Sequence, residues 1–234
     1  VIIKMDQDGG GDDYRNLFVL RNVTAAQLTA DNFDGIDPHG GPLPGLDYYG
    51  TENADTVYGT GRSDTIRGLG GNDYIQDYNG GDDNFLGGDG DDRIYARRNF
   101  DDAASTVMLQ GQNDDDYLSF NWYGGNAIEL IMNGGTGNDE LYLYFYQNYD
   151  IAESSITIDL GSGDDFVTMN WDAQVNLTLG SGQDTILFDN YFYGTVERII
   201  VEDFDPGTVT AAGTDGDVFM MDEMLFDYLD GWNG

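Results

Sequence analysis

The sequence predicts an all-β chain built from short repeated strands, and two features carry that prediction. Residues 50–95 divide into five units of nine residues, interrupted once by the single residue Asp77. Glycines gather in the first four positions of the units, Asp occupies every sixth position, and every eighth position is apolar. Glycine adopts positive φ easily, so positions one to six predict a turn. Side chains alternate along a strand, so positions seven to nine predict a short strand whose eighth residue points inward.

The sixth positions of the five units are Asp55, Asp64, Asp73, Asp83 and Asp92. The unit 87–95 fits the pattern G-G-x-G-x-D-x-U-x at every position. This tandem array resembles the calcium-binding β-roll of the RTX (repeats-in-toxin, hemolysin-type) family. The resemblance implies a right-handed parallel β-helix with two units in each coil. It would place Asp55, Asp73 and Asp92 along one edge, and Asp64 and Asp83 along the other.

The chemistry of these turns favours a metal ion. Each sixth-position Asp supplies a carboxylate oxygen next to backbone carbonyls that the glycines allow to point inward, and Ca²⁺ prefers such oxygen ligands. The alternative is a set of flexible, solvated loops, but the fixed apolar eighth position argues against it. We therefore expect several Ca²⁺ ions as the cofactor.

The composition agrees with calcium binding. The chain has 44 acidic and 9 basic residues and a formal charge of −35. Of the acidic residues, 37 are Asp and 7 are Glu, as short ligands in tight turns would require. Such a chain repels itself unless cations neutralise it, so we expect metal to drive folding. Without a basic patch, nucleic acid is not expected as a partner.

Cysteine is absent, so disulfides are excluded. No apolar run approaches the ~20 residues of a membrane-spanning helix, and the start of the chain lacks the features of a secretory signal peptide. The resemblance implies type I secretion, and hence an extracellular or cell-surface location reached without an N-terminal signal peptide. We also expect the chain to be part of a longer multidomain protein.

Before the repeats, residues 1–38 predict a strand, an acidic loop and a second strand. Asp6, Asp8 and Asp12 surround three glycines in this loop, so they are candidate metal ligands, although a solvated hairpin turn explains them equally well. Residues 39–49 are rich in proline and glycine and predict a linker into the roll.

After the repeats, residues 96–194 predict a continuation of the roll with longer coils. Glycine turns with a sixth-position Asp recur at Asp116, Asp139, Asp165 and Asp184, with spacings of 24, 23, 26 and 19 residues from Asp92 onward. Each spacing is one whole coil, so the aspartate turn is expected on one edge only. The roll would thus be two-sided at first and then one-sided. Alternation in the flanking strands predicts inward columns, one of them formed by Leu118, Leu141, Val167 and Ile186.

Outward positions on these strands offer a candidate ligand surface formed by Tyr117, Tyr142, Tyr144 and Tyr146. Exposed aromatic rows can contact an extracellular polysaccharide, or pack against a second copy or a neighbouring module of the same chain. Tyrosine is also a good strand former, so the row can simply stabilise the sheet. Residues 195–234 predict a strand and turn that leave the roll, followed by a short amphipathic helix. The roll would therefore carry small flanking α/β segments.

Catalysis finds little support in the sequence. The chain has one histidine, His39, and lacks the HExxH and CxxC motifs, so we do not expect an enzyme. The resemblance leaves two functions open. One is a calcium-binding structural module of a large secreted bacterial surface protein, such as an adhesin, a surface-layer protein or an extracellular fibre. The other is an accessory module of a secreted protease, lipase or polysaccharide epimerase.

Overall fold

The computed structural model describes residues 2–6, 14–19, 21, 24, 45–99, 102–124, 126–146, 154–170, 174–188, 199–205, 207, 209–210, 213–214 and 216–221. The chain divides into two compact units, residues 1–44 and residues 45–234. Each unit is described by itself.

The first unit contains an antiparallel pair of strands, β1 (Ile2–Asp6) and β2 (Tyr14–Val19). Both strands were expected from the sequence. Asp6 ends β1, whereas Asp8 and Asp12 lie outside the described residues.

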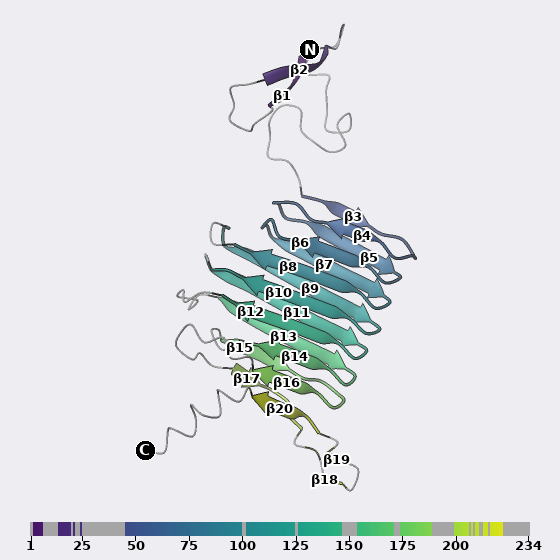
Figure 1. Cartoon of the computed structure of the whole chain (residues 1–234), viewed down its shortest axis with the longest axis vertical. Coiled ribbons are helices and arrows are strands. Elements are labelled where there is room, and N and C mark those ends of the chain that lie inside the picture. Colours follow the sequence, from purple (N-terminus) through teal and green to yellow (C-terminus); the bar gives the residue numbers. More distant parts are fainter. Residues whose placement is uncertain are drawn as a thin grey trace. The chain divides into compact units, whose positions relative to one another are not determined.

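The second unit is a parallel β-solenoid made of two eight-stranded sheets (Figure 1). The first sheet contains β3 (Asp47–Tyr49), β5 (Thr65–Gly70), β7 (Asp83–Asp89), β9 (Ser105–Asn113), β11 (Ile128–Thr136), β13 (Ser155–Ser162), β15 (Val175–Thr178) and β17 (Ile199–Val201). The second sheet contains β4 (Thr56–Tyr58), β6 (Tyr74–Asp77), β8 (Arg93–Arg98), β10 (Tyr117–Trp122), β12 (Glu140–Phe145), β14 (Phe166–Met169), β16 (Thr185–Phe188) and β20 (Val218–Met221). From β3 to β17, consecutive strands alternate between the sheets, so two strands make one coil.

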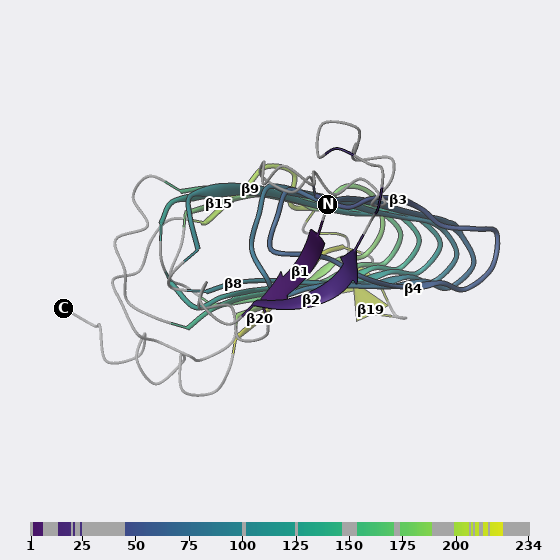
Figure 2. The same cartoon turned by 90° about the horizontal axis from the view of Figure 1, so that it is seen from above.

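Seen from above, the turns that lead from the first sheet to the second overlie one another at one edge (Figure 2). A small antiparallel pair, β18 (Val209–Thr210) and β19 (Gly213–Thr214), precedes the last strand. These observations confirm the all-β parallel solenoid. The described segments do not include a helix long and apolar enough to cross a membrane.

The core lies between the two sheets. The predicted inward column is confirmed, because Leu118, Leu141, Val167 and Ile186 are in register on neighbouring strands and fully buried. Each coil buries its apolar residues largely against the coils above and below, which makes the stack cooperative.

The solenoid extends beyond the predicted limits at both ends. Residues 47–49, expected in the linker, form β3 and pair with β5. They join the roll because Leu46 and Tyr48 pack against its core. At the other end, β17 and β20 extend the two sheets past residue 194, where the chain was expected to leave the roll.

The helix expected near the C-terminus is wrong for residues 218–221. These residues form β20, which pairs in parallel with β16. The cause is the residue before them, because the backbone N–H of Asp184 donates to Asp217 Oδ1 at 3.1 Å and aligns the next strand. The rest of the predicted helix, from residue 222 onward, lies outside the described residues.

Candidate metal centre: two rows of stacked aspartates

Turns from the first sheet to the second bring one aspartate per coil to the same edge. At each step the backbone N–H of one aspartate donates to Oδ1 of the aspartate in the next coil, at 2.7–3.1 Å. We call this series the long row; it consists of Asp55, Asp73, Asp92, Asp116, Asp139, Asp165, Asp184 and Asp217. The row places the seven predicted aspartates of this edge in one continuous stack.

The second carboxylate oxygen has a different environment. In the six members from Asp73 to Asp184, Oδ2 is buried and accepts no hydrogen bond. Burying an ionised oxygen without a partner is costly, so each of these atoms needs a cation or a proton. The relay through Oδ1 therefore fixes the position of six oxygens that the protein itself leaves unsatisfied.

Glycines at the first position of four turns keep space open beside these oxygens. A Cβ placed on Gly68, Gly87, Gly111 or Gly134 would lie 1.9, 2.1, 2.2 or 2.4 Å from Oδ2 of the aspartate in the same turn. It would also lie 2.3–2.8 Å from a backbone carbonyl oxygen of the next coil. A carboxylate oxygen and a carbonyl oxygen thus face the same small space. This oxygen donor set fits Ca²⁺.

The opposite edge carries a second, shorter series, which we call the short row. It consists of Asp64 and Asp83, joined by the same relay: the backbone N–H of Asp64 donates to Asp83 Oδ1 at 2.9 Å. The row ends at Asp83 because its counterpart in the next coil is Val107.

Asp77 joins the short row as a third carboxylate. Carboxylate oxygens of Asp64, Asp77 and Asp83 lie within 4.8 Å of one another, and Asp77 Oδ2 is buried without a hydrogen-bond partner. Asp77 takes the place that a first-position glycine has elsewhere, because it lies in register with Gly59. From the sequence, Asp77 was expected to be a single extra residue between two repeats. The feature of the sequence that indicates this role is the place of Asp77 at the start of the longer turn 77–83.

The comparisons with known proteins agree with this geometry. Residues 49–76 and 77–101, less than a quarter of the chain, match the family described as the RTX calcium-binding nonapeptide repeat. These residues are RTX calcium-binding repeats. Together with the parallel solenoid, they show that the chain contains an RTX calcium-binding β-roll. No curated protein and no solved structure gave a significant match.

The RTX roll continues well past the matched residues, because the long row runs on from Asp92 to Asp217. Asp217 was not among the predicted members of the row. The sequence feature that indicates its place is an Asp-Gly turn followed by an apolar run. That run was expected to be part of a helix. In its final position Asp217 accepts a second hydrogen bond, from the backbone N–H of Asp205 to Oδ2 at 2.7 Å.

The turns that end at Asp73, Asp92, Asp116, Asp139, Asp165 and Asp184 have positive φ at their second and fourth positions. In the turn 87–92 these positions are Gly88 (φ 130°) and Gly90 (φ 111°). Leu69 has the second position of its turn and adopts φ 81°, a conformation that costs a non-glycine residue energy. The backbone path is thus kept even where glycine is missing.

The turns 160–165 and 179–184 differ from the four turns of the long row that precede them. Their first positions are Leu160 and Leu179, and both side chains are fully buried in the core. They place an apolar side chain where glycine leaves space in the four earlier turns. Asp165 and Asp184 therefore share the backbone relay of the long row, whereas their surroundings are less suited to an ion.

Burial dominates the electrostatics of the long row. It raises the pKa of Asp116 to about 8, and the pKa values of Asp92 and Asp165 to about 7. The amide donor on each Oδ1 lowers the pKa, and neighbouring carboxylates raise it further. Without a cation these groups hold protons near neutral pH, so calcium would displace protons on binding.

Tyrosines form a ladder along the outer face of the second sheet. Rings of successive coils lie next to one another from Tyr58 to Phe166, with centroid distances of 6.3, 5.4, 5.3, 4.8 and 6.1 Å. The members in order are Tyr58, Tyr74, Tyr95, Tyr117, Tyr142 and Phe166. Tyr144 lies 6.5 Å from Tyr142 and 6.2 Å from Tyr146, and Tyr146 stacks on Tyr123 at 4.6 Å. The rings thus contact each other between coils, which favours sheet stabilisation; a sugar or protein ligand on this surface stays a prediction.

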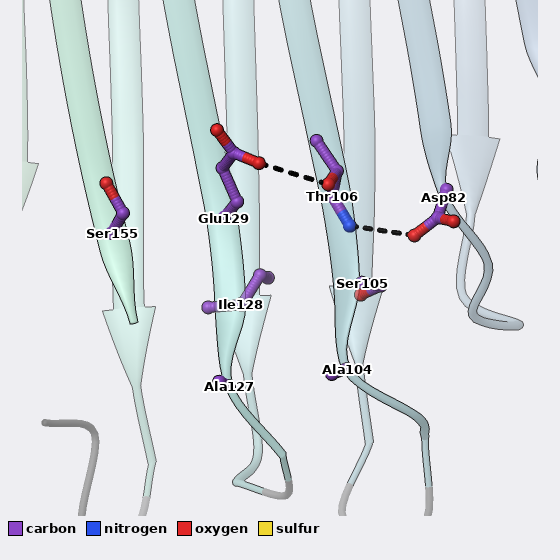
Figure 3. A pocket seen from close by; sticks show the side chains of 8 residues that line it. All are labelled: Asp82, Ala104, Ser105, Thr106, Ala127, Ile128, Glu129 and Ser155. Atoms are coloured by element: carbon purple, nitrogen blue, oxygen red, sulfur yellow. Dashed lines mark hydrogen bonds between the residues drawn. The ribbon is translucent and has the colours of Figure 1, made fainter. Parts of the chain in front are cut away.

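A shallow hollow on the first sheet is lined by Asp82, Ala104, Ser105, Thr106, Ala127, Ile128, Glu129 and Ser155 (Figure 3). Its two carboxylates both accept hydrogen bonds from Thr106. The backbone N–H donates to Asp82 at 2.9 Å and the hydroxyl donates to Glu129 at 3.2 Å. These bonds join three consecutive coils, so both carboxylates have a structural role here. His39 lies outside the described residues.

Proposed function

We propose that the chain is a calcium-dependent structural module of a large secreted bacterial surface protein, and that calcium drives its folding outside the cell. The observation that carries the proposal is the long row, in which six consecutive aspartates present a buried Oδ2 atom without a hydrogen-bond partner. Four of these oxygens adjoin a space that a glycine keeps open. The RTX repeats over residues 49–101 support calcium as the ion.

The negative charge of the chain explains why folding would require the ion. With a formal charge of −35, a chain that stacks its carboxylates 4–5 Å apart, as adjacent strands require, opposes its own folding. Metal binding supplies the missing free energy, because the complete set of ligands exists only in the folded coil. Extracellular calcium modules bind at roughly 10⁻⁴–10⁻³ M, so a site of this class would fill after export.

The remaining contacts favour a mechanical role. Parallel strands, the aspartate relay and the tyrosine ladder all connect each coil to the next, so an ion-filled stack would be a stiff rod. Such a rod suits an adhesin, a surface-layer protein or an extracellular fibre. The Asp82–Thr106–Glu129 bonds serve the same connection between coils.

Circular dichroism in the far ultraviolet tests this proposal. The chain is titrated with Ca²⁺ and then with EGTA, and Mg²⁺ is the control ion. The proposal predicts a cooperative change from a disordered to a β spectrum at millimolar Ca²⁺, reversed by EGTA and not reproduced by Mg²⁺. A chain that has the β spectrum in EGTA and does not respond to Ca²⁺ would overturn it.

A further inference from the structure

Arg98 is a cation buried inside the roll, next to the end of the short row. It is the last residue of β8, and only 2% of it is exposed. Its Nη2 donates to Asp83 Oδ2 and, at 2.7 Å, to the carbonyl oxygen of Gly81. Nη1 donates to the carbonyl oxygen of Arg97 at 2.8 Å, and Nε donates to Ser105 Oγ at 3.2 Å. All three guanidinium nitrogens therefore have acceptors.

The two acceptors of Nη2 are the two kinds of oxygen that surround the open spaces of the long row. There, an aspartate Oδ2 and a backbone carbonyl face the space beside a first-position glycine. In the short row, Asp83 Oδ2 and the Gly81 carbonyl face the Arg98 guanidinium instead. Accordingly, Asp83 Oδ2 is satisfied, whereas Oδ2 of Asp73 and of the next five aspartates of the long row is not.

The ends of the rows show that the protein supplies a donor wherever a row stops. At the start of the long row, Asp55 Oδ2 accepts the backbone N–H of Thr51 at 2.7 Å. At its end, Asp217 Oδ2 accepts the backbone N–H of Asp205. Asp83 is the last aspartate of the short row, and its donor is a charged side chain.

We infer that Arg98 is a built-in cation, which takes the place of a metal ion at the end of the short row. The inference rests on the proposed function, since it assumes that calcium fills the comparable spaces of the long row. The short row stops at Asp83, because the next coil offers Val107 in place of an aspartate. The guanidinium supplies a positive charge to Asp83 without a further aspartate from the next coil. Asp77 Oδ2 remains the one oxygen of the three-carboxylate cluster without a donor.

Replacing the guanidinium by an apolar side chain of similar length tests the inference. In Arg98→Met, Asp83 Oδ2 and the Gly81 carbonyl lose their donor and resemble the oxygens of the long row. Equilibrium dialysis with radioactive calcium should then find one more ion per chain than in the wild type. The melting temperature of the variant should fall more at a limiting calcium concentration that still folds the wild type than in saturating calcium.

Two further variants are matched controls. Arg67→Met removes a guanidinium from an exposed ion pair with Asp47 (2.7 Å) and should leave the ion count unchanged. The double variant Asp83→Asn/Arg98→Met removes the carboxylate as well and should return to the wild-type count.

An Arg98→Met chain that binds the wild-type number of ions and loses equal stability at limiting and at saturating calcium would overturn the inference; Arg98 would then belong to an ordinary buried ion pair. If this variant does not fold even in calcium, the number of ions bound by the Asp83→Asn variant tests the inference instead. An unchanged ion count supports a guanidinium in this place, and the loss of one ion refutes it. A wild-type chain that binds no calcium overturns the proposed function as well, so the two failures are distinguishable.

Discussion

Two parts of the long row have the same backbone and different surroundings. The turns ending at Asp73, Asp92, Asp116 and Asp139 begin with glycine, whereas the turns ending at Asp165 and Asp184 begin with leucine. All six take part in the same Oδ1 relay, and all six have a buried Oδ2 without a hydrogen-bond partner. The relay therefore positions the carboxylates, while the first residue of the turn decides how much space an ion has.

The turns that begin with leucine, which we call the leucine turns, have a buried apolar side chain where the other turns have this space. Leu160 and Leu179 are fully buried, and such burial contributes about 1.5–3 kcal/mol per side chain. We therefore expect the last coils of the roll to depend more on their core, and the earlier coils more on calcium.

The largest effect is expected from a methyl group in a glycine turn. In Gly111→Ala, the new Cβ would lie 2.2 Å from Asp116 Oδ2 and 2.5 Å from the Gly134 carbonyl oxygen. Steric strain and the lost ion should together lower the free energy of unfolding in calcium by roughly 3–5 kcal/mol. Urea denaturation monitored by circular dichroism measures this loss of free energy of unfolding. Gly61→Ala is the control, because its Cβ would approach nothing closer than 3.1 Å; equal losses in the two variants would contradict the account.

Removing one charge should affect the two kinds of turn differently. Asp116→Asn keeps an Oδ1 acceptor for the relay but loses the ion, which costs about 2.7 kcal/mol when calcium is at 100 times its dissociation constant. Asp184→Asn, in a leucine turn, should cost clearly less under the same conditions. Melting temperatures at limiting and at saturating calcium give the comparison. A loss that is the same at both calcium concentrations would show that Asp116 does not act through an ion.

Protons should compete with calcium in the long row. Burial raises the pKa of Asp116 to about 8 and that of Asp139 to about 6, from an ordinary value of 3.8, so the metal-free folded state binds more protons than the unfolded chain. Its stability is therefore greatest at low pH and falls as the pH rises through about 6–8. In EGTA the far-ultraviolet circular dichroism spectrum should show more β structure at pH 5 than at pH 8. In calcium, the concentration for half-maximal folding should instead be higher at pH 5; a pH-independent midpoint would refute the competition.

The smallest effect is expected at Leu69, which occupies a turn position where most of the neighbouring turns have glycine. Leu69 adopts φ 81° and 43% of it is exposed, so Leu69→Gly relieves backbone strain and loses only part of a side chain's burial. The free energy of unfolding should rise by about 1 kcal/mol, at limiting and at saturating calcium alike. A gain that grows with the calcium concentration would mean that Leu69 obstructs an ion rather than straining the backbone.

The repeated features of the roll could be predicted from the sequence because they are local. Alternation places Leu118 and Leu141 inward, and the glycine turns place Asp116 and Asp139 one coil apart. The short apolar run from Val218 has no such periodicity, so strand and helix could not be told apart until Asp217 was known to join the row.

Asp77 and Arg98 could not be placed for a different reason. Asp77 appeared to be an insertion, since the sequence does not show which residue of the longer turn takes the position of the first glycine. Arg98 reaches Asp83 from another strand, over 15 residues of chain. A contact of this kind depends on the register of the coils, which no single motif specifies.

Crystals of the calcium-loaded protein, measured for the anomalous scattering of calcium, would show whether the long row holds ions. We expect strong peaks between consecutive turns beside Asp73, Asp92, Asp116 and Asp139, weaker peaks or none beside Asp165 and Asp184, and no peak at the Arg98 guanidinium. Peaks of equal height along the whole row would show that the leucines do not limit the ions. An absence of peaks beside the four glycine turns would contradict calcium binding by the long row.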